Sequence, residues 1–80
     1  MATVHFSSGL RRYTEGAEEI RVEAASVREL MRVLDERYPK LREALESLAI
    51  AIDGQIISDP LLETLAPDAD VHFLPPIAGG

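Results

Sequence analysis

The strongest constraint on the fold is an amphipathic helix pattern in residues 26–38. Ser26 and Glu29 have the spacing of a capping box, in which the two side chains bond free amide groups at a helix start. Apolar residues then recur at spacings of three and four along one helical face: Val27, Leu30, Met31, Leu34 and Tyr38. Pro39 disfavours helical geometry at Tyr38 and should end the helix there or just before. We interpret the stripe as a core face rather than as a cofactor-binding surface.

Segments on both sides of this helix alternate between apolar and polar residues, which is typical of half-buried strands. We expect strands over residues 3–7, 19–24, 48–52, 55–58 and 71–74. The third and fourth strands are joined by Asp53 and Gly54, a strong two-residue hairpin signal. Other expected features are a loop over residues 8–18, a short helical turn over residues 41–45 and a turn at residues 67–68.

The order of these elements predicts an α+β fold, with a mixed sheet of about four to five strands and one main helix packed on one face. This pattern matches the β-grasp architecture of ubiquitin-like proteins. We predict that the last strand lies parallel to the first and beside it, at the centre of the sheet. Val71 and Phe73 would then pack beside Val4 and Phe6 against the helix.

Length and cysteine content limit what such a domain can do. A chain of 80 residues has room for one domain, expected over residues 1–75, followed by a flexible tail over residues 76–80. The chain has no cysteine, so it cannot form a disulfide, a zinc–thiolate site or a persulfide. It shows no secretion signal and no apolar run of about 20 residues, which favours a cytoplasmic protein without a membrane span.

The net charge of −6 is unevenly distributed. Residues 1–40 carry seven Lys and Arg against seven Asp and Glu, whereas residues 41–80 carry only Arg42 against seven acidic residues. We expect no nucleic-acid partner, because phosphate binding needs clustered cations. The acidic half is compatible with steering toward a basic protein partner, and also with a solvated face that keeps the protein soluble.

The last eight residues, 73–80, read Phe-Leu-Pro-Pro-Ile-Ala-Gly-Gly. Pro75 and Pro76 fix φ and remove two backbone donors, so the chain should leave the sheet there as an extended arm. Residues 77–80 reach roughly 13 to 14 Å at about 3.3 to 3.6 Å per residue, which is enough to enter another protein's active site. Gly79 and Gly80 lack a Cβ and would let a narrow channel admit the backbone and the terminal carboxylate. A Gly-Gly ending can also be an ordinary frayed terminus.

This ending resembles the terminal motif of the MoaD/ThiS family of ubiquitin-like sulfur carrier proteins, and in particular its molybdopterin synthase small-subunit branch. In that family the last strand ends in an aromatic residue, an apolar residue and two prolines, followed by Val or Ile, a small residue and Gly-Gly. Residues 73–80 fit every position. Two positions elsewhere depart from the family pattern: Arg12 replaces an acidic residue after Leu10 and Arg11, and Ala69 replaces a glycine before the last strand.

The resemblance implies a carrier that is not itself an enzyme and that is modified at Gly80. An adenylyltransferase related to ubiquitin-activating enzymes would use ATP and magnesium to adenylate the Gly80 carboxylate, and a persulfide donor protein would supply sulfur to make a thiocarboxylate. A large synthase subunit would then receive the tail for sulfur transfer to a pterin precursor. The tail residues are Pro75, Pro76, Ile77, Ala78, Gly79 and Gly80. The same tail also fits carriers for thiazole, cysteine or tRNA thiolation, and a ubiquitin-like interaction or conjugation module.

The sequence shows no catalytic constellation, so attention turns to the sheet face opposite the helix. That face would carry small or weakly polar residues: Thr3, His5, Ser7, Ala49, Ala51, His72 and Leu74. We expect the adenylyltransferase to dock near Phe73, Leu74, His5 and Ala51, because it must hold the body while the tail reaches inward. The alternative is an ordinary solvated sheet face. His5 and His72 would be neighbours, but without carboxylates or thiols at ligand spacing we expect no metal site.

Overall fold

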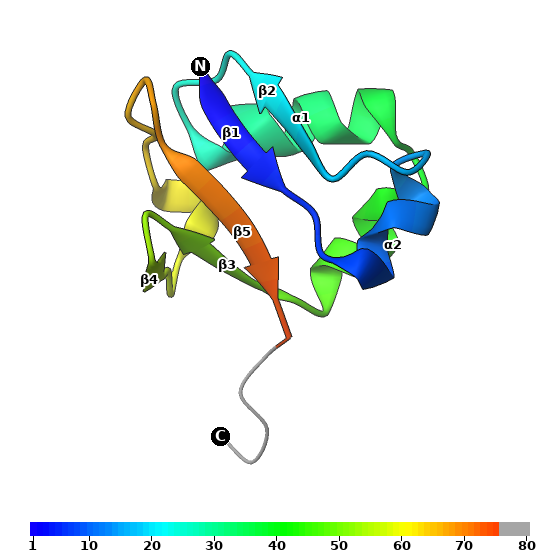
Figure 1. Cartoon of the computed structure of the whole chain (residues 1–80). Coiled ribbons are helices and arrows are strands. Elements are labelled where there is room, and N and C mark those ends of the chain that lie inside the picture. The colour runs from blue at the N-terminus through cyan, green and yellow to red at the C-terminus, as the bar shows by residue number, and fades with distance from the viewer. Residues whose placement is uncertain (76–80) are drawn as a thin grey trace.

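A five-stranded mixed sheet forms one layer of the computed structural model, which describes residues 1–75. The strands are β1 (Ala2–His5), β2 (Glu19–Val22), β3 (Ala49–Ile52), β4 (Gln55–Ile56) and β5 (Asp70–Leu74). Their order is β2-β1-β5-β3-β4, with β5 parallel to β1 and antiparallel to β3. The last strand therefore lies at the centre beside the first (Figure 1), which confirms the predicted β-grasp arrangement.

The second layer is built around α1 (Val27–Arg37), which crosses one face of the sheet (Figure 1). The Ser26 half of the predicted capping box is confirmed, because Ser26 Oγ accepts a hydrogen bond from the Glu29 N–H at 3.1 Å. The helix ends before Tyr38, whose N–H donates to the Leu34 carbonyl at 2.8 Å, and Pro39 prevents a further turn. A short helix, α2 (Leu41–Glu46), confirms the predicted second helical turn.

The hydrophobic core lies between the sheet and these helices. Val4 and Val71, which are partners in the β1–β5 ladder, are completely buried, as is Leu30 of α1. Phe73 is the partner of Ile50 in the β3–β5 ladder, and both side chains are buried. Burying a side chain of this size stabilises a fold by about 1.5 to 3 kcal/mol, so these residues fix the position of β5. The predicted inward face of the central strands is confirmed.

The turn between β3 and β4 also fixes the start of β5. Asp53 and Gly54 both have positive φ, 49° and 85°, which is the signature of a type I′ turn and confirms the predicted hairpin. Asp53 Oδ1 accepts a hydrogen bond from the Asp70 N–H at 3.0 Å. The Asp53 N–H in turn donates to the Asp70 carbonyl at 2.9 Å. One tight turn therefore positions two neighbouring strands.

Two short 3₁₀ helices replace segments that were expected to be irregular. The first, η1 (Ser8–Tyr13), stands where a loop was expected, and β1 ends at His5 rather than at Ser7. Its buried residue, Leu10, ties the segment to the core. The second, η2 (Pro60–Leu62), begins with a proline, which suits the first position of a helix because its missing N–H would have no helical partner.

The turn before β5 accommodates alanine where the family has glycine. The Ala69 N–H donates to the Ala66 carbonyl at 3.1 Å, and the only non-glycine residues with positive φ in the described part of the chain are Glu15 and Asp53. Ala69 therefore needs no left-handed backbone, and its methyl group is buried in the core. The substitution changes the residue without straining the turn.

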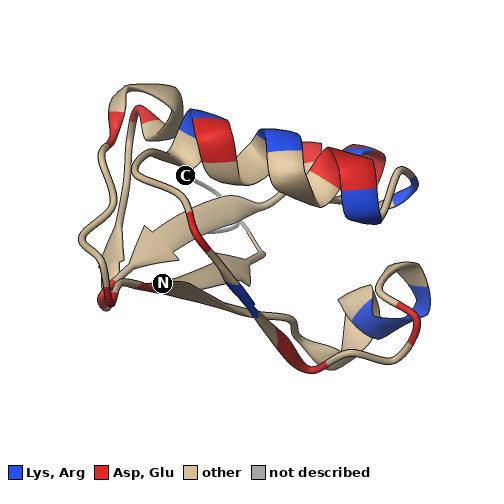
Figure 2. Cartoon of the chain, turned by 90° about the horizontal axis from the view of Figure 1, so that it is seen from above, with Lys and Arg blue, Asp and Glu red and all other residues tan. Residues whose placement is uncertain are grey.

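Charged residues lie along α1, on η1 and on the edge strand β2. Seen from above, Lys and Arg alternate with Asp and Glu along α1, whereas the central strands are mostly uncharged (Figure 2). None of the helices in residues 1–75 combines the length and the apolar character needed to cross a bilayer.

Candidate functional site

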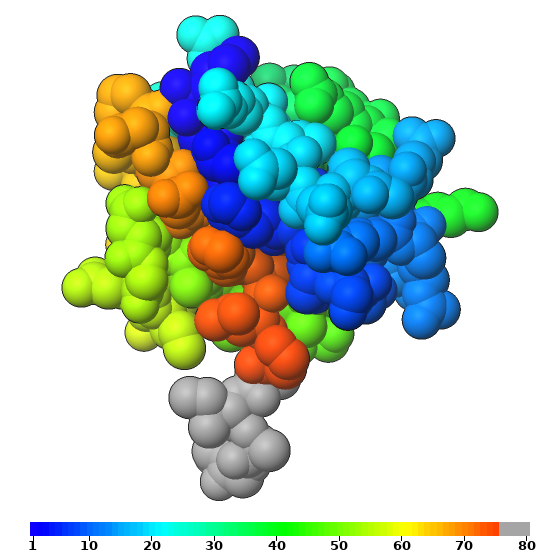
Figure 3. Space-filling model, viewed as in Figure 1, coloured from blue at the N-terminus to red at the C-terminus, as the bar shows by residue number. Residues whose placement is uncertain are grey.

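The predicted tail begins where β5 ends, at the lower end of the molecule in Figure 3, which views the sheet face opposite α1. The strand is held from both sides, since His72 is the partner of His5 in β1 and Leu74 is the partner of Ala49 in β3. Pro75 follows the strand directly and is exposed; it has no N–H to continue the ladder. Five predicted tail residues lie outside the described part of the chain: Pro76, Ile77, Ala78, Gly79 and Gly80. The tail therefore starts from a strand that is hydrogen-bonded on both sides, and we call its starting point, Leu74 and Pro75, the tail root.

A cavity of about 370 Å³ lies at this root. Its lining comes from the end of β1 and the two residues after it, from η1, from the start of β2 and the residue before it, and from β5: His5, Phe6, Ser7, Arg11, Glu18, Glu19, His72, Phe73 and Leu74. Arg11 Nη2 pairs with Glu18 Oε1 at 3.2 Å, while Arg11 Nε is buried without a hydrogen-bond partner in residues 1–75. An unpaired buried donor is costly, so this N–H lowers the stability of the segment rather than adding to it.

Sequence reasoning assigned no role to Arg11. The signal was weak, because a pair of arginines in a segment without periodicity is usually exposed loop. The 3₁₀ geometry of η1 turns this side chain toward Glu18, which could not be read from local pattern.

His5 and His72 form a stack on the open sheet face. Their ring centroids are 4.3 Å apart and their planes differ by 6°, which confirms that the two residues are neighbours. His5 Nε2 lies 3.0 Å from Asp70 Oδ1, and His5 Nδ1 lies 3.9 Å from Glu19 Oε1. The sequence shows no carboxylate at ligand spacing from these two histidines. Strand pairing nevertheless brings two carboxylates beside His5, because Glu19 is its β2 partner and Asp70 begins the neighbouring strand.

These four side chains do not amount to a metal centre. No group of three or more His, Cys, Asp or Glu with geometry suited to a metal ion occurs within residues 1–75. The chemistry available at the histidine stack is hydrogen bonding to a partner and a flat surface for apolar contact.

The four predicted docking residues fall into two groups. Leu74 is 37% exposed and His5 is partly exposed, so both can contact another protein. Phe73 and Ala51 are each 4% exposed, so their side chains offer a partner little surface, and docking near them stays a prediction. Phe73 packs in the core, and Ala51 is covered because the larger residues His72 and Ile56 flank it on the adjacent strands.

The sequence matches a family model over nearly its whole length. The ThiS family model covers residues 4–80 and thus extends through the Gly-Gly ending. Among curated protein sequences, none matches this chain.

Solved structures with the same fold include proteins from three organisms. A chain of the subunit 1 and 2 complex of molybdopterin-converting factor from Helicobacter pylori 26695 is 29% identical, with a TM-score of 0.74 over 99% of this chain and 97% of that chain. A chain of the BexX/CysO complex from Amycolatopsis orientalis is 20% identical, with a TM-score of 0.86 over 100% of both chains.

Small archaeal modifier protein 1 from Methanosarcina acetivorans is 23% identical, with a TM-score of 0.81 over 99% of this chain and 95% of that chain. At this level of identity, the second and third structures establish the ubiquitin-like fold alone. The family match, together with the central β5 that leads into the Gly-Gly ending, establishes more: the chain belongs to the ThiS family of small, ubiquitin-like sulfur carriers.

Proposed function

We propose that this protein carries sulfur as a thiocarboxylate at Gly80 and donates it in molybdopterin biosynthesis. The observation that carries the proposal is the family match, which runs through residue 80 and so includes the Gly-Gly ending. The position of β5 supports it, because a ladder on both sides holds the strand that presents the tail. The protein has no catalytic role of its own and acts as a co-substrate of its partners.

The proposed cycle needs three partner activities. A ubiquitin-activating-like adenylyltransferase uses ATP and magnesium; the Gly80 carboxylate attacks the α-phosphate and releases pyrophosphate. A persulfide sulfur of the donor protein then attacks the acyl carbon and releases AMP. A thiol cleaves the resulting S–S bond, becoming a disulfide with the donor cysteine, and leaves sulfur on Gly80. Such ATP-dependent chemistry fits a cytoplasmic location.

The third partner is a large synthase subunit that accepts the tail. Two observations support a synthase of the molybdopterin type: the Pro75-Pro76 root, and the 29% identity to a chain in the two-subunit molybdopterin-converting factor complex. In this proposal residues 76–80 act as the arm that enters the synthase, while residues 1–75 remain folded outside. The thiocarboxylate sulfur bonds to a carbon of a pterin precursor, and water then hydrolyses the acyl–sulfur bond, which leaves sulfur on the precursor and returns Gly80 to the carboxylate form.

The test is to incubate the full chain with its adenylyltransferase, ATP, magnesium and a persulfide donor, and to look for a thiocarboxylate at Gly80. Selective alkylation followed by fragmentation must place the modification, because exchange of oxygen for sulfur has nominally the same mass change as methionine oxidation. Deleting Gly80 should abolish the product. One missing residue retracts the carboxylate by roughly 3.3 to 3.6 Å, and a misplacement of about 1 Å can cost on the order of a hundredfold in rate.

Circular dichroism of the truncated chain provides the control, since the described core does not involve residue 80. Thiocarboxylate formation by the truncated chain, or its absence from the intact chain with matched partners, would refute the carrier role. Sulfur transfer to a thiazole or tRNA acceptor, but not to the pterin precursor, would refute only the pathway.

A further inference from the structure

The helical side of the molecule carries a hollow that the sulfur-carrier role does not use. Two cavities of about 320 and 310 Å³ adjoin there and share Met31, Leu45 and Leu61. The second cavity continues inward to Ile50 and Phe73. We call the combined hollow, floored by Met31, Leu45 and Leu61, the helix-side trough. It is formed by α1, α2 and η2, on the layer that covers the sheet.

Part of the apolar lining of the trough is accessible. Leu61 is 58% exposed although it lines both cavities, and Met31 is only partly buried, whereas Leu45 is 5% exposed. Leu61 and Met31 are therefore the apolar side chains of the trough that another molecule can contact.

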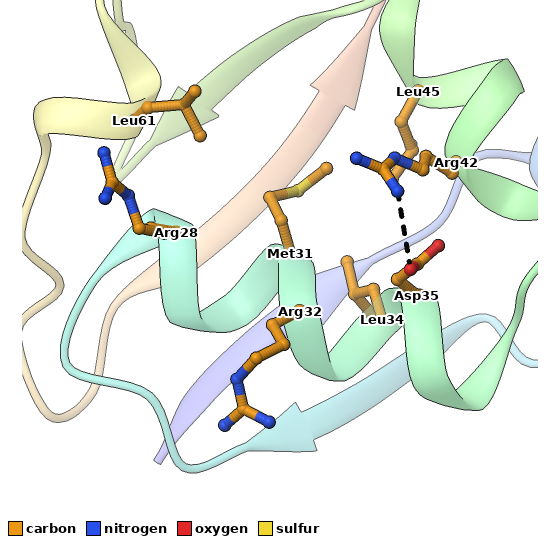
Figure 4. Close-up of a pocket in the computed structure, with 8 residues that line it drawn as sticks. All are labelled: Arg28, Met31, Arg32, Leu34, Asp35, Arg42, Leu45 and Leu61. Carbon is orange, nitrogen blue, oxygen red and sulfur yellow. Dashed lines mark ion pairs between the residues drawn. The ribbon is translucent and has the colours of Figure 1, made fainter.

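Arginines outnumber acidic residues around the trough. The first cavity is lined by Arg28, Arg32, Arg42 and Asp35, and the second cavity adds Glu46, although the chain as a whole has a net charge of −6. Arg32 is already paired with Glu36, at 3.2 Å. Figure 4 shows Arg28 beside Leu61 and Arg42 on the opposite side of Met31, whereas Arg32 extends away from both. Arg28 forms no ion pair with any residue in 1–75. A carboxylate of a partner protein would complement the positive charge of these arginines.

Asp35 does not neutralise the arginines that line the first cavity. Arg42 Nη1 lies 3.6 Å from Asp35 Oδ2, and both side chains are well exposed, at 66% and 43%. An ion pair in such a setting contributes about 0 to 1 kcal/mol and exchanges readily for another carboxylate. Arg28 is therefore open to an acidic partner, and Arg42 can exchange Asp35 for a carboxylate of that partner.

The backbone around the trough determines how a partner can bind. The edges of the sheet are β2 and β4, whereas the trough is lined mainly by helical segments, whose backbone groups are bonded internally. A partner therefore cannot add a strand here and must bind through side chains. An amphipathic helix provides such side chains, with apolar anchors at spacings of three and four.

We propose that the helix-side trough binds an acidic amphipathic helix of another protein. Leu, Phe or Met anchors of that helix contact Met31, Leu45 and Leu61, and flanking Asp or Glu residues pair with Arg28 and Arg42. The surface lies on the helical layer, so a partner bound there leaves the open sheet face and the tail root accessible. The inference does not depend on the chemistry at Gly80.

The test is a titration of the ¹⁵N-labelled full chain with a synthetic two-heptad peptide that has Leu on one face and Glu on the other. We expect saturable amide shifts around Met31, Leu45 and Leu61. The same peptide with Lys in place of Glu should bind roughly tenfold more weakly or not at all, which corresponds to about 1.4 kcal/mol. Raising the salt concentration should weaken binding of the acidic peptide.

Matched variants distinguish specific binding at the trough from nonspecific binding elsewhere on the protein. The charge-reversing double substitution Arg28→Glu with Arg42→Glu should weaken binding about tenfold, whereas Arg21→Glu on the exposed side of β2 should leave it unchanged. Leu61→Ala should weaken binding, whereas Leu62→Ala should not, because Leu62 is 78% exposed and lines neither cavity.

Three outcomes would overturn the proposal. The first is the absence of saturable shifts with the acidic peptide. The second is equal binding of the acidic and basic peptides, or shifts confined to the sheet face around His5 and His72. The third is concentration-dependent dimerisation that Leu61→Ala abolishes, which would make a second copy of this chain the occupant.

Discussion

At the scale of single residues, burial separates the side chains that hold the fold from those that can meet a partner. Leu30 is completely buried on α1, opposite the central strands. Leu30→Ala should lower the free energy of unfolding by about 2 to 5 kcal/mol, because it removes apolar contact and leaves a cavity. Leu62→Ala is the control; this leucine is 78% exposed, and its loss should change stability by less than about 0.5 kcal/mol. Equal urea midpoints for the two variants would contradict the core assignment.

The open sheet face needs a different probe, because its small residues are not all accessible. Ala51 is buried between His72 and Ile56, so Ala51→Glu should destabilise the fold by about 2 kcal/mol or more through burial of a carboxylate. It is therefore unsuitable as a test of docking. Leu74→Glu places the same charge on a residue that is 37% exposed and should leave the melting temperature within a few degrees.

Leu74→Glu should instead weaken binding of the adenylyltransferase, because it puts a charge on apolar surface at the root of the tail. Isothermal titration calorimetry with the partner measures this effect. Normal affinity of the adenylyltransferase for the Leu74→Glu protein would contradict the prediction that this partner docks on the sheet face opposite α1.

At the scale of elements, local signals decide where the helix begins and where the hairpin turns. The Ser26 hydroxyl bonds the Glu29 N–H at 3.1 Å, so Ser26→Ala should cost about 0.5 to 2 kcal/mol of stability. Ser58→Ala is the control, since Ser58 is exposed and caps no helix among the described residues. A loss of the same size in both variants, measured by chemical denaturation, would mean that the cap does not stabilise α1.

The elements that sequence pattern predicted share one property, which is a strong local signal. The helix has a cap, a stripe and a terminating proline, and the hairpin has Asp53-Gly54 with both residues at positive φ. The 3₁₀ helix η1 has neither periodicity nor a side-chain cap at Ser7, and only Leu10 marks it as packed. The sequence therefore did not predict η1, whose conformation depends on its packing against the rest of the fold.

Contacts at the candidate site were harder to predict than the elements that form it. Alternation assigned His5, Ala51 and His72 to one sheet face, but it could not show that two neighbouring side chains cover Ala51. The bond between His5 and Asp70 at 3.0 Å joins residues 65 positions apart. It depends on the parallel β1–β5 register, which no local pattern specifies.

At the scale of the whole molecule, the two halves of the chain differ in charge while they share one core. Residues 41–80 carry seven acidic residues and one arginine, and most of those acidic side chains in the described part are exposed. The described acidic residues lie on α2, on turns and at the start of β5, outside the core. This arrangement can act at long range on a basic partner, or it can serve solubility alone.

Salt dependence distinguishes these two roles. If the acidic half steers association, the on-rate for the adenylyltransferase should fall as ionic strength rises from about 0.01 to about 1 M, because the Debye length shrinks from about 30 to about 3 Å. The dissociation rate should change much less, since steering acts before contact. Stopped-flow fluorescence measures both rates. Asp68→Lys, an exposed position in the turn before β5, should slow association at low salt without changing dissociation. An on-rate that is independent of salt and of Asp68→Lys would leave solubility as the role of the acidic half, because a charge that steers a partner must be screened by ions.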